Sequence, residues 1–135
     1  MKKLISTLSL ILFLGVIMAS AQDNSKVMSD EKVSQSEVKA YYFHATRRCA
    51  TCEAVEAVTR EALKEYYGDK VAFESINREE EKDNPLIEKY KISGQTLLIV
   101  KGNKKVNLTN DAFLNARSKP EKLKSKLKST IDSMM

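Results

Sequence analysis

Two cysteines, Cys49 and Cys52, stand three positions apart in the stretch HATRRCATCEAVEAV, and the chain contains no others. Thiols at this spacing can perform three kinds of chemistry. They can exchange reversibly with a disulfide, they can bind a soft metal or a trivalent metalloid, or they can form an inert structural bridge. Which of these applies depends on the elements that hold the two side chains.

The cysteines lie where a predicted strand gives way to a predicted helix. Residues 38–44 (VKAYYFH) are aromatic and β-branched, which is typical of a buried strand. Apolar residues then recur at steps of three and four, which predicts a helix over about 49–67. A cysteine at a helix start lies beside unpaired backbone N–H groups and the positive end of the helix dipole. We therefore expect the pKa of the Cys49 thiol to fall below the ordinary value of about 8.5.

Reversible exchange is the interpretation that this position favours. Cys52 follows one helical turn after Cys49, so the two sulfur atoms can meet without a backbone movement. A closed loop this short restricts the unfolded chain very little, and the bridge would be a weak structural staple. We expect Cys49 to attack a disulfide and Cys52 to resolve the mixed disulfide. Metal or metalloid binding by the same two thiolates, and an inert bridge, remain alternatives.

Three neighbouring residues could modulate such a pair. Arg47 and Arg48 precede Cys49, and their positive charge would favour its thiolate and steer an anionic substrate. The alternative is that both arginines are solvated on a loop. His44 lies at the end of the predicted strand and could shuttle a proton, although a lone histidine there is more often a packed strand residue.

The remaining pattern completes a mixed α/β domain. A Gly102-Asn103 turn predicts a β-hairpin, and Ser118 with Glu121 resembles a capping box at the start of the last helix. The further elements are a strand at 71–77, a short helix near 86–89, strands at 97–101 and 104–108, and a last helix with Leu123, Leu127, Ile131 and Met134 on one stripe. The order β-α-β-α-β-β-α is that of the thioredoxin fold, with a mixed sheet of about four strands flanked by helices.

The N-terminal residues have the composition of a cleavable secretory signal. Lys2 and Lys3 precede an apolar run over residues 4–18, and Ala19-Ser20-Ala21 supplies small residues for a signal peptidase. The apolar run is short for a membrane span, so no span is expected after cleavage. We therefore expect residues 1–21 to be removed and the protein to be periplasmic or secreted, where disulfides persist.

The rest of the chain is predicted to form one domain behind a linker. Residues 22–36 are polar and lack periodicity, which predicts a flexible linker, and residues 37–135 hold the predicted elements. The leader carries two lysines and no acidic residue, so its removal lowers the formal net charge from +5 to +3. Lysine and glutamate are interspersed along the helices, which favours solvated faces, and no nucleic acid is expected as a partner.

The stretch YYFHATRRCATCEAVE, residues 41–56, resembles a group of small exported thioredoxin-like proteins of bacteria. These are described as the nitrophenyl-compound nitroreductase subunit family associated with organoarsenical resistance. The resemblance implies a two-electron relay whose redox group is the Cys49–Cys52 disulfide. No glycine-rich strand-to-helix turn is present to bind a flavin or nicotinamide, so no other cofactor is expected. The implied partner is a protein, either a membrane electron donor or a second small C-x-x-C subunit.

Single positions carry over from the thioredoxin superfamily with departures. Cys49 matches the exposed nucleophile and Cys52 the resolving cysteine. Thr96 falls where the superfamily holds a cis-proline opposite the disulfide, and a cis bond before a non-proline residue costs about 2.5 to 4 kcal/mol, which favours a trans peptide here. An ungapped comparison puts Phe43 in place of the buried acidic residue beneath the pair. These departures imply a dedicated partner or a small-molecule substrate.

Overall fold

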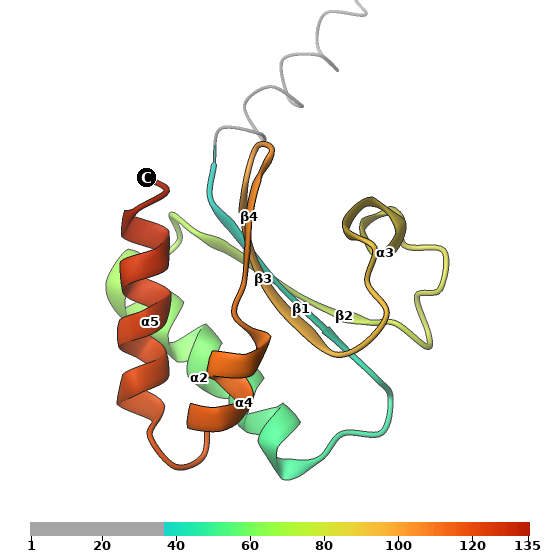
Figure 1. Ribbon diagram of the computed structural model, residues 1–135, viewed down its shortest axis with the longest axis horizontal. Helices are drawn as coiled ribbons and strands as arrows, with labels where there is room; N and C mark the ends of the chain where they lie inside the picture. The colour runs from blue at the N-terminus through green and yellow to red at the C-terminus, as the bar shows by residue number, and fades with distance from the viewer. Residues whose placement is uncertain (1–36) are drawn as a thin grey trace, which may run out of the picture.

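The computed structural model describes residues 37–135 (Figure 1), so the predicted signal and linker lie outside the described residues. The elements are the strands β1 (Lys39–His44), β2 (Ala72–Asn77), β3 (Thr96–Lys101) and β4 (Lys104–Asn107), and the helices α2 (Ala50–Tyr67), α3 (Pro85–Tyr90), α4 (Thr109–Asn115) and α5 (Pro120–Asp132). Every predicted strand and helix is present, within one or two residues of its predicted bounds. One helix, α4, was not predicted.

The four strands form one mixed sheet in the order β2-β1-β3-β4. β1 pairs with β2 in parallel and with β3 antiparallel, and β3 and β4 form the predicted hairpin. In Figure 1, α2, α4 and α5 lie on one side of the sheet and α3 on the other. The sheet and its flanking helices confirm the predicted thioredoxin-like architecture.

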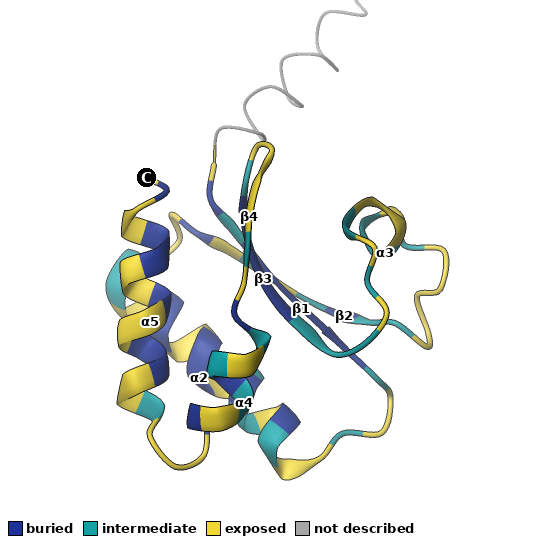
Figure 2. Ribbon diagram, viewed as in Figure 1, coloured by how far each residue is buried: buried dark blue, intermediate teal, exposed yellow. Residues whose placement is uncertain are grey.

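The larger core lies between the sheet and the pair α2 and α5. Dark blue buried positions face inward along both helices in Figure 2. Helices form here because apolar residues recur at helical spacing, and burying that stripe supplies most of their stability. The α2 residues in this core are Val55, Val58, Ala62 and Leu63, and those of α5 are Leu123, Leu127 and Ile131.

A second, smaller core lies on the α3 side of the sheet. Successive residues of a strand point to opposite faces, so β1 divides its aromatic side chains between the two cores. Tyr42 packs in the core with α2, whereas Tyr41 and Phe43 pack with Ile76 beneath Leu86 and its neighbours. The orientation of Phe43 therefore matters for the site at the end of β1.

The last helix begins differently from the prediction. Pro120 occupies the first turn of α5, and the residue at the cap is Lys119, with no side-chain capping bond. The predicted capping box from Ser118 to Glu121 is wrong, because the Ser118 hydroxyl instead donates to the Leu114 carbonyl oxygen at 3.2 Å. Proline suits the first helical position because its fixed φ fits a helix and it lacks the N–H that would go unpaired.

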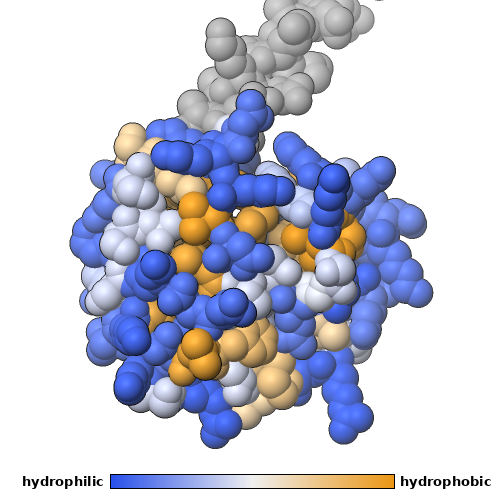
Figure 3. All heavy atoms as spheres, viewed as in Figure 1, coloured by the Kyte–Doolittle hydropathy of each residue, from blue (hydrophilic) through white to orange (hydrophobic). Residues whose placement is uncertain are grey.

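The surface seen in Figure 3 is largely hydrophilic, with hydrophobic patches separated by hydrophilic residues. Leu114 is a large apolar side chain that stays 76% exposed. Within residues 37–135, no helix combines the length and apolar character that crossing a membrane would require.

Two leucines on neighbouring helices give a matched test of the core. Leu127→Ala should lower the free energy of unfolding by about 2 to 5 kcal/mol, because the Leu127 side chain of α5 is fully buried in the larger core. Leu114→Ala should change it by less than about 0.5 kcal/mol, because its side chain is exposed. Urea denaturation measures both. Equal losses would contradict this difference in packing.

Candidate active site

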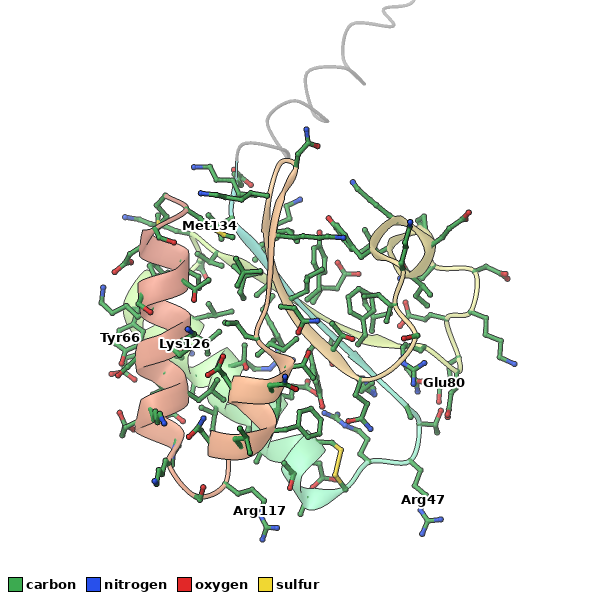
Figure 4. The ribbon with its side chains drawn as sticks, in the orientation of Figure 1. Arg47, Tyr66, Glu80, Arg117, Lys126 and Met134 are labelled. Carbon is green, nitrogen blue, oxygen red and sulfur yellow. A yellow bond between two sulfur atoms is a disulfide. The ribbon has the colours of Figure 1, made fainter. Side chains whose placement is uncertain are left out.

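Cys49 and Cys52 are joined as a disulfide at the N-terminal end of α2, with their Cα atoms 5.1 Å apart. Figure 4 shows the sulfur–sulfur bond at this end of the helix, near the end of the sheet where the loop from β1 arrives. The sequence prediction that the two sulfur atoms can meet at a helix start is confirmed. The pair lies at the carboxyl end of β1, because only residues 45–49 separate that strand from α2.

Cys49 is the cap residue of α2. Its backbone is extended, with φ −91° and ψ 161°, and its sulfur accepts a hydrogen bond from the Cys52 backbone N–H at 3.3 Å. A cap side chain satisfies one of the backbone donors that a helix start leaves unpaired. In the reduced protein the same donor would stabilise a Cys49 thiolate.

The two cysteines differ in exposure. Cys49 is exposed, whereas only 2% of Cys52 is accessible. Cys52 is one turn inside the helix, on the side that carries Val55 into the core. An incoming sulfur can therefore reach Cys49 more readily than Cys52.

The loop that delivers Cys49 is tied to the loop after β2. The Thr46 backbone N–H donates to Glu79 Oε2 at 3.0 Å, and the Asn77 amide donates to the Thr46 hydroxyl oxygen at 3.0 Å. The Arg78 N–H donates to the His44 carbonyl oxygen at 2.9 Å and continues the contact between the two chain segments. These bonds fix the path of the chain just before the disulfide.

The two arginines before Cys49 have different surroundings. Arg47 is exposed and points away from the body of the protein in Figure 4. Arg48 folds back along α2, where it forms an ion pair with Glu56 and donates to the Cys52 carbonyl oxygen at 3.5 Å. The alternative of two solvated loop arginines therefore describes Arg47 only.

Glu56 was not singled out from the sequence. It follows Cys52 by four positions, a spacing that puts both residues on one face of a helix. This spacing is the feature of the sequence from which its place near the disulfide could have been predicted. Burial acts to raise the pKa of its carboxyl, but hydrogen bonds from Arg60 and Arg48 outweigh burial and hold the pKa below the ordinary 4.5. The group is therefore a carboxylate at neutral pH.

His44 is largely buried, at 9% exposure, as the packed interpretation predicts. Its Nδ1 lies 2.9 Å from the Ala45 carbonyl oxygen, and its ring centroid is 5.8 Å from that of Tyr42. Two residues apart on β1, Tyr42 and His44 share the sheet face that carries α2. Phe43 points to the α3 face. The ungapped placement of Phe43 beneath the cysteines is therefore wrong.

Thr96 begins β3 and pairs with Phe43 of β1. This register puts it at the carboxyl end of β1, the end from which the chain leads to the cysteines. Its hydroxyl donates to the Gly94 carbonyl oxygen at 3.1 Å. No peptide bond among residues 37–135 is cis, so the Gln95–Thr96 peptide is trans.

Among residues 37–135, no three side chains of the His, Cys, Asp and Glu types are grouped so that they could hold a metal ion. Cys49 and Cys52 are the ligands that the metal alternative predicts, and in this structure their sulfur atoms are bonded to each other.

No family model matches the sequence, and no curated protein matches it either. Solved structures do match it, and they agree with this architecture. Among solved structures, the thioredoxin Deadhead of Drosophila melanogaster is 20% identical with a TM-score of 0.50, over 87% of this chain and 100% of that one.

Two further solved structures are similar. Fasciola hepatica thioredoxin is 17% identical, with a TM-score of 0.51 over 81% of this chain and 91% of that one. Trxlp of Edwardsiella tarda EIB202 is 14% identical, with a TM-score of 0.53 over 76% and 93%. The chain has a thioredoxin-like fold. The C-x-x-C pair lies at the start of α2, with its sulfur atoms bonded to each other.

The bond between Thr46 and Glu79 gives a pH test of the loop. Hydrogen bonds from Thr46 lower the pKa of the Glu79 carboxyl below its ordinary 4.5. A carboxyl whose folded pKa is depressed contributes stability above its unfolded pKa and loses it as the pH falls through the folded pKa. As Glu79 is protonated its bond to Thr46 weakens, so the Thr46 amide resonance should shift with pH below pH 4.5 in an NMR series, and Glu79→Gln should markedly reduce that shift. An unchanged shift in the variant would contradict the contact.

Proposed function

We propose that this protein is a thiol–disulfide oxidoreductase in which Cys49 is the nucleophile and Cys52 the resolving cysteine. The observation that carries the proposal is the asymmetry of the pair. Cys49 is exposed and caps α2 with its sulfur, while Cys52 is buried one turn inside the helix. An inert bridge has no need of this asymmetry, whereas stepwise exchange depends on it.

The exchange proceeds in two steps. The Cys49 thiolate attacks one sulfur of a substrate disulfide, which breaks that bond, forms a mixed disulfide and releases one substrate thiolate. Cys52 then loses its proton and attacks the Cys49 sulfur, which closes the Cys49–Cys52 disulfide and releases the second substrate thiolate. Two electrons pass to the substrate, and the released thiolates take up protons from solvent. Reversal of the steps oxidises a dithiol substrate.

We further propose that the domain is an exported relay within a system that reduces nitroaromatic or organoarsenical compounds. The signal-like composition of residues 1–21 supports export, and the resemblance of residues 41–56 supports the system. A dithiol supplies electrons two at a time, as nitro-group reduction requires. The proposed partner is a second small C-x-x-C subunit or a membrane electron donor, which would reduce the disulfide again.

Variants of the two cysteines should trap different species. Cys52→Ser should accumulate mixed disulfides with partner proteins, because the resolving thiol is missing. Cys49→Ser should trap almost none, because the remaining thiol is buried. Affinity purification of each variant from cells, followed by non-reducing gels and mass spectrometry, measures the trapped species and identifies the partner.

Equal trapping by both variants, or by neither, would contradict the proposal. The reduced wild-type protein should then be titrated calorimetrically with zinc, copper and a trivalent arsenical. Submicromolar binding of about one equivalent, with a matching gain in thermal stability, would favour the metal-binding alternative.

The reduction potential should be more oxidising than that of thioredoxin, which is about −270 mV. The Cys52 N–H and the dipole of α2 stabilise the Cys49 thiolate and thus the reduced form, and exposed Arg47 adds to this. Equilibration in glutathione buffers, followed by thiol trapping, measures the potential. A value at or below that of thioredoxin would contradict this electrostatic argument.

A further inference from the structure

Glu56 and Arg48 form an ion pair against the turn that carries the disulfide. Arg48 directly precedes Cys49 in the chain, and its guanidinium donates to both the Glu56 carboxylate and the Cys52 carbonyl oxygen. The side chains of Arg48 and Glu56 are only 24% and 17% exposed. Solvent and salt therefore screen these two charges less than they screen charges on the open surface.

We infer that Glu56 sets the redox equilibrium of the Cys49–Cys52 pair by balancing the charge of Arg48. This inference rests on the proposed exchange function and concerns the same site. A cation beside Cys49 favours its thiolate and so favours the dithiol over the disulfide. A carboxylate bound to the same guanidinium opposes that effect. Glu56 therefore keeps the disulfide harder to reduce than it would be beside an unbalanced Arg48.

The contacts of Arg48 hold its charge in a fixed place. Its guanidinium carbon lies 5.8 Å from the centroid of the Tyr42 ring, which is fully buried. Burial raises the pKa of the Tyr42 hydroxyl, the charge of Arg48 opposes that rise, and the charge of Glu56 adds to it. The charges of Arg48 and Glu56 are therefore both felt at buried Tyr42, on the sheet face that carries α2.

Glu56 is itself held from two sides. Its Oε1 accepts from Arg60 at 2.9 Å, while its Oε2 binds Arg48. Arg60 lies four positions further along α2 and its side chain is 59% exposed. The carboxylate is thus attached to the helix surface and directed toward the loop that carries Arg48.

Apart from Arg78, which is half-buried and donates to the Ser93 carbonyl oxygen at 3.4 Å, the other charges near this end of the sheet are better solvated. Arg47 and Glu53 are exposed, and so are Glu79 and Glu80. Both of the latter accept hydrogen bonds from Thr46 in the loop before the disulfide. Because they are exposed, their effects on a thiolate are weakened by water and salt. The half-buried pair of Arg48 and Glu56 should therefore affect the stability of the Cys49 thiolate more than these exposed charges do.

Variants of the two residues should shift the equilibrium in opposite directions. Glu56→Gln keeps the shape of the side chain and an acceptor for Arg48 but removes the negative charge, so the dithiol should be favoured by about three- to tenfold. Arg48→Gln removes the positive charge and should favour the disulfide by a similar factor. The double variant should lie close to wild type.

Two measurements on the full chain test this. Glutathione equilibration gives the redox equilibrium constant, and the pH dependence of Cys49 alkylation by iodoacetamide gives the stability of its thiolate. Glu56→Asp retains the charge and should restore the wild-type equilibrium even if the protein becomes less stable. Glu61→Gln is the matched control, since this exposed glutamate of α2 binds Lys124 of α5, and it should leave both measurements unchanged.

Each outcome decides the question. Opposite shifts that cancel in the double variant support the charge balance. Shifts of one sign, or loss of thermal stability with no shift, would overturn it and leave a structural ion pair. Alkylation reports the Cys49 thiolate even in a protein that exchanges with no partner. Failure of the charge balance can therefore be distinguished from failure of the exchange function, which the cysteine trapping variants test.

Discussion

The hydrogen bond from the Cys52 N–H to the Cys49 sulfur is the constraint on which the site depends. It requires Cys49 to stand at the cap position, which exposes its sulfur, and it places Cys52 inside the first turn, where it is buried. α2 is held against the sheet by Val55, Val58 and the apolar residues beyond them. The helix start is thus positioned by the core, and opening the disulfide removes little of what holds it there.

The parts of this arrangement that were predicted from the sequence are those encoded locally. β1, α2 and the β3–β4 hairpin each carry a periodic or turn pattern within their own residues, and the structure confirms all three. The placement of Cys49 at the helix start followed from the boundary between two such patterns. α4 was missed because seven residues give too short a period to recognise, and Pro120 outweighed the capping pattern at α5.

The rest of the site depends on contacts between residues distant in the sequence. Whether Phe43 faces the disulfide or α3 depends on strand register, and a displacement of one residue reverses the face. Arg48 pairs with a carboxylate eight positions later because the loop folds back along α2. The hydrogen bond from the Thr46 N–H to Glu79 joins residues 33 positions apart, and no local sequence pattern predicts it.

Two sources of charge act on Cys49, namely the backbone groups of the α2 N-terminus and the side chains of Arg48 and Glu56. The helix N-terminus acts through backbone groups that do not titrate, so its effect on Cys49 is the same at every pH. Hydrogen bonds from Arg60 and Arg48 keep the pKa of the Glu56 carboxyl below 4.5, so Glu56 is a carboxylate at neutral pH. An arginine side chain carries its charge at any pH at which a protein is folded. Around neutral pH the charge balance beside the disulfide is consequently a property of the sequence at these two positions, and it changes by substitution.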